Sequence, residues 1–315
     1  MDTYVIRRLA AAAGLTVAVV TVVFLLLRLV PGDVVLVMLG ENEAPPDKVA
    51  AMRHALGLDR PLVVQYASWL SGTLRGDFGH SFLSGRPIGT DLAARAPRSL
   101  ELTGAALLLG VTVGVPLGAL AARRRGSLLD FVAGGVAIVG VTFPSFVVGS
   151  VAVLLFGLVL HWFPATGYVD FRSDPLGHLR HLVLPAATLA LEIVAITMRM
   201  TRSSVLETLS QDFVRTAWAK GLGTAAVLVR HILRNSLIPV VTVIGLQAGT
   251  LLGRIVLVEY IFNWPGLSTL LLSGIYQRDY PVVQAVVLIV ALAFVCINLV
   301  VDLTYGAIDP RIRLG

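Results

Sequence analysis

Apolar residues occur in six long runs along the chain, separated by shorter polar stretches. A helix needs about 20 apolar residues to cross the roughly 30 Å hydrocarbon core of a bilayer, and each run is long enough. The pattern predicts an all-α membrane protein with one transmembrane domain over residues 1–315. Its six helices are expected at 9–30, 99–122, 131–163, 182–203, 237–258 and 281–303. The first run is long for a signal peptide and lacks a small-x-small cleavage site, so we expect it to be retained.

Two parts of this pattern need interpretation. The run 131–163 is long enough to raise the question of two helices, but Pro144 and scattered glycines offer no polar hairpin. One kinked or tilted helix with an interfacial end is therefore expected. The segment 31–98 carries a helix start at Pro45-Pro46-Asp47 and breaks at 57–61 and 76–79. It predicts a small helical segment on the external surface.

Composition excludes a water-soluble globule. Hydrophobic residues make up 56% of the chain and charged residues 14%, and the mean hydropathy is +0.84. The net charge of +6 does not indicate nucleic acid, because the basic residues cluster beside apolar runs, where they report orientation and attraction to anionic lipid. The single cysteine, Cys296, allows no intrachain disulfide and no metal cluster.

Positive charge predicts the orientation of the helices. Under the six-helix scheme the basic residues gather on one side of the membrane. They are Arg7, Arg8, Arg123, Arg124, Arg125, Arg199, Arg202, Arg215, Lys220, Arg230, His231, Arg234, Arg311 and Arg313. Both termini are therefore expected in the cytoplasm, and segment 31–98 on the opposite side.

Glycines recur every four residues in two of the predicted helices, at Gly110, Gly114 and Gly118 and at Gly245, Gly249 and Gly253. Such stripes let helix backbones approach closely, and tight packing is a more common reason for them than contact with a substrate. Gly245, Gly249 and Gly253 nevertheless remain candidates for the translocation pathway.

Glu192 is expected near the middle of the fourth helix, where an ionised carboxylate must face protein or water. A residue lining a cavity and a buried structural carboxylate are equally compatible with this position. A self-sufficient channel or proton-coupled carrier using Glu192 is the alternative function, although no second buried ionisable group is obvious. A membrane scaffold or sensor without transport is a third hypothesis.

Motifs for other chemistry are missing from the sequence. His178 and His181 lie near Asp174 but lack a third strong metal ligand fixed by spacing, so interfacial histidines are the better interpretation. The chain has no protease motif and no Gly-x-x-x-x-Gly-Lys-Ser/Thr phosphate loop, so it is not expected to hydrolyse ATP unaided or to carry a cofactor.

The segment 212–235 is more elaborate than a simple connection between two membrane helices. Phe213, Val214, Ala217 and Trp218 predict a short helix with an apolar face, which Lys220-Gly221 should end. A second helix is expected from Ala225 to Asn235, leading into Pro239. A loop lying on anionic headgroups is the simpler interpretation. A rigid pair of helices can transmit a displacement, however, which favours docking of a partner.

Several motifs along the chain are similar to those of one transporter family. They are Ile6-Arg-Arg-Leu9, Pro31-Gly-Asp33, Leu56-Gly-Leu-Asp-Arg-Pro61, Gly76-Asp-Phe-Gly79, Arg199-Met-Thr-Arg-Ser-Ser-Val-Leu-Glu207, Arg215-Thr-Ala-Trp-Ala-Lys-Gly221, His231-Ile-Leu-Arg-Asn-Ser-Leu-Ile-Pro239, Ile261-Phe-Asn-Trp-Pro-Gly266, Arg278-Asp-Tyr-Pro-Val-Val283, Asp302-Leu-Thr-Tyr-Gly306 and Asp309-Pro-Arg311. With them the chain resembles the B-type permease subunit of bacterial ABC importers of the dipeptide, oligopeptide and nickel group. Arg215-Thr216-Ala217 stands where the family's "EAA" loop has Glu-Ala-Ala, as is usual in this subgroup.

The resemblance implies a type I ABC importer permease fold in the bacterial inner (cytoplasmic) membrane. It implies a second homologous permease, two cytoplasmic ATPases that hold the ATP and Mg, and an external substrate-binding protein. The residues implied to couple to an ATPase are Phe213, Val214, Arg215, Thr216, Ala217, Trp218, Lys220 and Gly221. Short peptides or a similar small solute are the implied cargo, with nickel chelates among the alternatives. Glu192 departs from a typical dipeptide permease.

Overall fold

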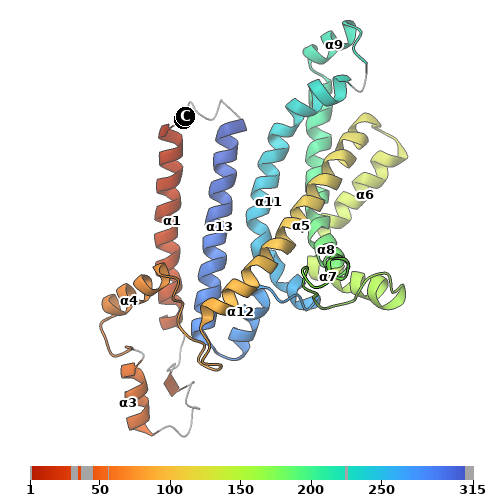
Figure 1. Cartoon of the computed structure of the whole chain (residues 1–315). Coiled ribbons are helices and arrows are strands. Elements are labelled where there is room, and N and C mark those ends of the chain that lie inside the picture. Colours follow the sequence, from red (N-terminus) through yellow and green to blue (C-terminus); the bar gives the residue numbers. More distant parts are fainter. Residues whose placement is uncertain (1, 30–34, 37–44, 56, 224–225, 309–315) are drawn as a thin grey trace. The chain divides into compact units, whose positions relative to one another are not determined.

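The computed structural model describes residues 2–29, 35–36, 45–55, 57–223 and 226–308. Within these ranges the chain is a succession of helices (Figure 1). In chain order they are α1 (Asp2–Leu29), α3 (Pro46–Ala55), α4 (Leu62–Leu74), α5 (Ile88–Arg123), α6 (Leu128–Thr142), α7 (Ser145–Ala152), the π-helix η1 (Val153–Val159), α8 (Pro175–Leu209), α9 (Asp212–Ala219), the π-helix η2 (Val227–Leu233), α11 (Arg234–Ile261), α12 (Leu267–Tyr276) and α13 (Tyr280–Ile308). The prediction of an all-α protein is confirmed.

Four of the described helices are long and apolar enough to cross a membrane by themselves: α1, α5, α8 and α13. Two more spans are possible, each made of helices that meet at a bend. One combines α6 with α7 and η1, and the other combines the end of η2 with α11, which gives up to six spans. Two boundaries differ from the predicted ones. Helix α5 begins at Ile88, well before residue 99, and α8 extends from Pro175 to Leu209 beyond both ends of 182–203.

The third apolar run, expected as one kinked or tilted helix, is broken between residues 142 and 145. Helix α6 ends at Thr142 and α7 begins at Ser145, and the two meet at 109°. Phe143 precedes Pro144 and has an extended backbone, with φ −84° and ψ 128°. A proline disfavours helical geometry in the residue before it and has no N–H to donate, which accounts for the break. With 15 residues, α6 is only about 22 Å long and falls short of the hydrocarbon thickness.

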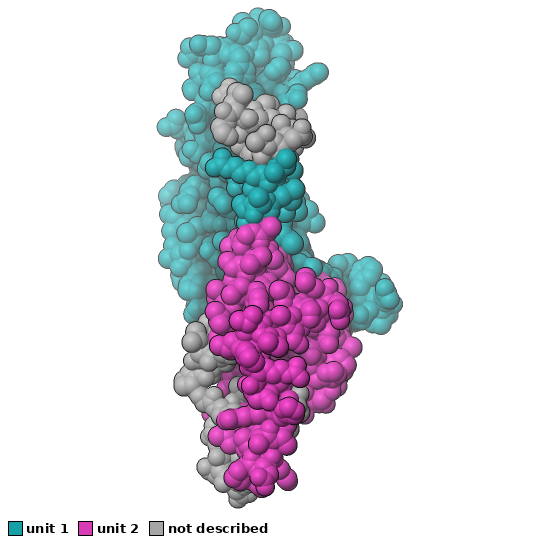
Figure 2. Space-filling view, turned by 90° about the vertical axis from the view of Figure 1, so that its left-hand side faces the viewer, with its two compact units in different colours: residues 1–11, 100–264, 294–315 teal, residues 12–99, 265–293 magenta. Residues whose placement is uncertain are grey.

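The chain divides into two compact units, coloured separately in Figure 2. Unit 1 comprises residues 1–11, 100–264 and 294–315. Its main core brings together apolar side chains of α5, α8 and α11, among them Leu102, Leu189, Ile193 and Val258, each buried. This core holds together the helices that carry most of the candidate functional residues.

Within unit 1 the glycines of α5 lie directly against α8. A Cβ atom added at Gly114 would come within 2.9 Å of Thr197 Cβ, and one at Gly118 within 2.8 Å of Thr201 Cβ. Such distances are too short for real contacts, so α5 and α8 meet backbone to backbone. The packing interpretation of this glycine stripe is confirmed.

Unit 2 comprises residues 12–99 and 265–293. The described part of segment 31–98 is largely helical, as expected, in α3, α4 and the start of α5. In α4, Tyr66 stacks edge-on against Phe24 of α1 at a ring distance of 5.0 Å. Asp279, which is buried, accepts hydrogen bonds from the Ser81 hydroxyl (2.6 Å) and the Phe82 N–H (3.2 Å). These contacts attach the loop before α5 to the start of α13.

Some predicted features lie outside the described residues. They are the motifs Pro31–Asp33 and Asp309–Arg311, the basic residues Arg311 and Arg313, and the beginning of the expected second loop helix at Ala225.

Candidate coupling site and translocation pathway

Helix α9 lies at the end of α8 and α11 that is remote from α7 (Figure 1). It starts at Asp212, whose negative charge suits a helix N-terminus, and ends at Ala219, with Lys220 as its C-cap. Gly221 follows with φ +77° and donates its N–H to Trp218 O at 2.9 Å. Glycine adopts this left-handed conformation without steric cost, which makes it a good helix stop. The predicted end of the short helix at Lys220-Gly221 is confirmed.

The two sides of α9 have different surroundings. Val214 and Ala217 are buried in an apolar cluster with Ala122 of α5, Val205 of α8 and Ile232 of η2. The four apolar residues expected on one face, Phe213, Val214, Ala217 and Trp218, have the spacing of one side of a helix, and the two central ones, Val214 and Ala217, are covered by the chain itself. Phe213 remains 40% exposed and Trp218 44% exposed.

Phe213 and Trp218 flank the buried pair on either side and remain partly exposed next to polar neighbours. Arg215, Thr216 and Lys220 are all exposed. Arg215 lies 3.6 Å from Asp212, but both side chains are largely in solvent, so this ion pair contributes little to stability. The exposed part of α9 and Lys220 therefore presents two partly exposed aromatic rings, two positive charges and the negative charge of Asp212.

Hydrogen bonds beneath α9 connect α11 to α8. The buried Ser236 hydroxyl lies 2.9 Å from Thr208 Oγ1 and 3.2 Å from Ser204 O. Phe213 lines a cavity of about 280 Å³ between these two helices, which Pro239 also borders. The second loop helix does not end at Asn235 as expected, since η2 continues directly into α11 and the helix passes through Pro239. Its bend there is 40°.

Glu192 of α8 forms an ion pair with Arg254 of α11. The two side chains retain 28% and 43% exposure, respectively. The sequence placed both charges in apolar helices but did not predict that they pair, because residues 62 positions apart in sequence carry no periodic signal of contact. Charges in membrane helices face protein or water rather than lipid, so this side of α8 and α11 is turned toward the protein interior or an aqueous space.

The three pathway glycines have different environments. Gly245 is buried. At Gly249 a Cβ would lie 3.0 Å from Asn298 Nδ2 and 3.3 Å from Phe294 Cε2 of α13, so this position is a close helix contact. Gly253 is exposed, with nothing within 4 Å of an added Cβ. Of the three, only Gly253 borders open space next to Arg254.

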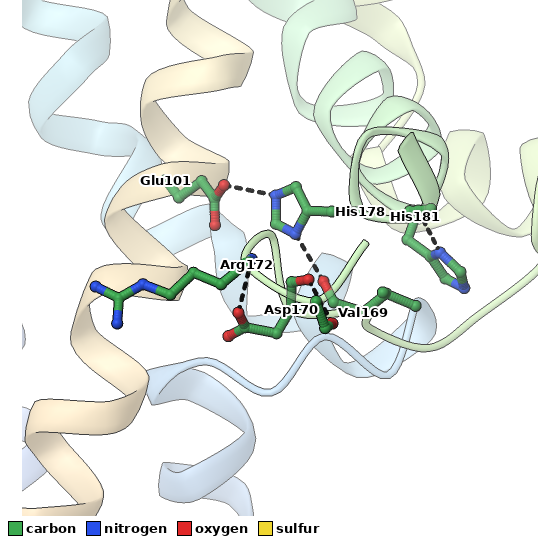
Figure 3. A network of polar contacts seen from close by, with 8 residues as sticks. Glu101, Val169, Asp170, Arg172, His178 and His181 are labelled. Carbon is green, nitrogen blue, oxygen red and sulfur yellow. Dashed lines mark hydrogen bonds and ion pairs between the residues drawn. The ribbon is translucent and has the colours of Figure 1, made fainter. Parts of the chain in front are cut away.

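The two histidines of α8 take part in hydrogen bonds within the chain (Figure 3). His178 is 1% exposed, and its Nε2 lies 2.6 Å from Glu101 Oε1 of α5, while Nδ1 lies 2.7 Å from Val169 O. His181 Nδ1 lies 2.7 Å from Gly177 O. Asp174 caps α8 by accepting from the N–H of Gly177 at 2.9 Å. Within the described ranges, no group of three or more His, Cys, Asp or Glu residues is placed to hold a metal ion.

Two family models together match most of the chain. Residues 114–314 match the binding-protein-dependent transport system inner membrane component, and residues 1–103 match the N-terminal component of the same systems. The chain belongs to this family. It is a transport component of the inner membrane, and the assignment supports the importer interpretation rather than a carrier that works alone.

Curated relatives cover the chain from end to end. A probable peptide ABC transporter permease protein, y4tP, of Sinorhizobium fredii is 40% identical over 99% of this chain and 100% of its own length. A putative peptide transport system permease protein of Brucella abortus is 42% identical over 99% of both chains. The dipeptide transport system permease protein DppB of Escherichia coli is 39% identical over 98% of both.

Among solved structures, a chain of the MetNI methionine ABC transporter in inward-facing conformations matches with a TM-score of 0.57. The match covers 70% of the present chain and 96% of the MetNI chain at 15% identity, so it shows the fold and no more. The predicted type I ABC importer permease fold is confirmed.

Proposed function

We propose that this family member is the permease subunit of an ATP-driven importer of short peptides. It forms half of the translocation pathway beside a second, homologous permease. Two cytoplasmic ATPases, which hold ATP and Mg, drive it, and an external binding protein delivers the solute. The observation that carries the proposal is α9, whose inner side is anchored by Val214 and Ala217 while Phe213 and Trp218 stay exposed. Relatives named as peptide permeases support the choice of cargo.

The anchored helix provides a physical route for coupling. A force applied to the exposed rings passes through the buried cluster to Val205 of α8 and Ile232 of η2. Because η2 continues into α11 without a break, a shift of α9 displaces the membrane-crossing part of α11 as well. Nucleotide-dependent closure of the ATPases would then bias the permease between two conformations through differential contacts at this surface.

The translocation pathway is proposed to lie on the side of α8 and α11 that carries Glu192, Arg254 and Gly253. An ion pair that keeps partial exposure within apolar helices needs water or a second protein surface beside it. Gly253 leaves space next to the pair. A short peptide carries one positive and one negative terminus, which an acid and a base side by side can accommodate.

The proposed orientation places both termini in the cytoplasm. Arg8, near the start of α1, forms an ion pair of 2.9 Å with Asp302, near the end of α13. This contact within unit 1 supports placement of both termini on one membrane face, and the basic residues assign that face to the cytoplasm.

Uptake of a labelled dipeptide by membrane vesicles tests the function. Vesicles holding the full set of partners should accumulate the peptide only with ATP and the binding protein. Transport by this chain reconstituted alone, independent of ATP and abolished by Glu192→Gln, would instead establish the carrier alternative. Co-purifying partners without any solute flux would establish a scaffold.

A further inference from the structure

A groove runs along α6 beside the C-terminal half of α8, entirely within unit 1. Its volume is about 620 Å³. Phe131 and Ile138 of α6 line it and are 80% and 69% exposed, respectively. Between them lie Gly134 and Gly135, where an added Cβ would meet nothing within 4 Å. The missing side chains leave the groove open and apolar along the helix.

One end of the groove is positively charged. Asp130 lies there, but it is neutralised by Arg202, which donates from Nε to Oδ1 (2.6 Å) and from a terminal nitrogen to Oδ2 (2.9 Å). Arg199 also lines this end, is exposed, and forms no ion pair with any residue the structure describes. Three exposed arginines at positions 123–125 immediately precede Gly126 at the same end. An anion is the complementary ligand.

The length of the groove identifies the kind of molecule that fits. From Leu128, where α6 begins, to Ile138 is ten residues, or about 15 Å along a helix. This is roughly half of the 30 Å hydrocarbon thickness, so the apolar part spans one leaflet. A transmembrane helix of a partner would cross both leaflets, whereas a phospholipid occupies one and places its phosphate at the membrane surface.

We propose that this groove binds one anionic phospholipid of the leaflet on the side of Arg199. The phosphate lies against Arg199, and an acyl chain lies over Gly134 and Gly135 between Phe131 and Ile138. The site is separate from α9 and from the Glu192–Arg254 pair. It therefore does not depend on the proposed peptide transport, and its test uses lipid binding rather than uptake.

Native mass spectrometry of the full-length protein in detergent tests the site, with dioleoyl phosphatidylglycerol as the anionic lipid and dioleoyl phosphatidylcholine as the zwitterionic one. Arg199→Gln should weaken phosphatidylglycerol binding about fivefold, the effect of one basic residue at a membrane surface, and leave phosphatidylcholine unaffected. Gly135→Leu should fill the groove and remove the bound lipid.

Two matched controls separate the groove from general effects. Arg180→Gln changes an exposed arginine at the opposite end of the same helix α8. Gly104→Leu adds the same side chain to an exposed helical glycine of α5 that also has nothing within 4 Å. Both variants should bind phosphatidylglycerol as the unmodified protein does.

Three results would overturn the proposal. The first is equal phosphatidylglycerol binding by Arg199→Gln, Gly135→Leu and the controls. The second is binding of inorganic phosphate as tight as that of the lipid, which would show a site for a free anion. The third comes from a photoreactive benzoylphenylalanine introduced at Phe131 in membranes: crosslinks to a second protein chain rather than to lipid would show that a partner subunit covers the groove.

Discussion

Removal of the indole of Trp218 should uncouple the permease from its ATPase. A tryptophan side chain presents roughly 250 Å² of surface, and 44% of that of Trp218 is exposed. A partner that covers this remainder, about 110 Å², gains about 2.7 kcal/mol at about 25 cal/mol per Å². The substitution Trp218→Ala should therefore weaken ATPase binding by up to about 100-fold. By the same arithmetic, the roughly 140 Å² of Trp218 that the permease already covers contributes up to about 3.5 kcal/mol, so the substitution should also lower the free energy of unfolding.

The assay measures two quantities on the same preparations. Binding of the ATPase to the purified permease gives the dissociation constant, and uptake of a labelled dipeptide by vesicles gives the transport rate. Trp162→Ala is the matched control, since it makes the same truncation at a residue that is 64% exposed and lies outside segment 212–235. It should bind the ATPase normally. If Trp218→Ala binds the ATPase and imports peptide as well as the control does, α9 is not the docking surface.

Three further substitutions test the packing and the pathway. Gly118→Leu should lower the thermal unfolding temperature sharply because the backbone of α8 occupies the space, while Gly104→Leu, with open space around it, should not. Asp279→Ala should cost about 1 to 3 kcal/mol of stability, since it leaves two donors unpaired, and unchanged denaturation would disprove that role. Glu192→Gln alone should reduce peptide uptake more than the double variant with Arg254→Gln, because the single change leaves an unpaired charge in an apolar helix; equal losses would argue against this coupling.

The hydrophobic pattern predicted the helical content and the general position of the membrane helices well. Apolar runs show where a helix can cross a bilayer, but not where it ends once it leaves the lipid, since polar residues also form helices. Helix α5 therefore begins at Ile88, inside the segment predicted to be external. The sequence predicts a kinked or tilted helix around Pro144. The 109° angle between α6 and the α7–η1 helix depends on what the following residues pack against, and the spacing of apolar residues carries no information about that packing.

The candidate coupling helix shows the same limit at the level of side chains. The sequence placed a short helix before Gly221, and the structure has it there. It does not divide these apolar residues into a covered and a partly exposed set, because all four lie on one side of the helix. That division requires the neighbouring residues Val205 and Ile232, which come from other helices.

The glycine stripe of α5 has a consequence for how the protein changes shape. Side chains that interlock can slide past one another by switching rotamers, but backbones in direct contact have no such freedom. We therefore expect α5 and α8 to travel as one rigid body during each transport cycle. The conformational change must then be absorbed at seams where longer side chains separate the helices.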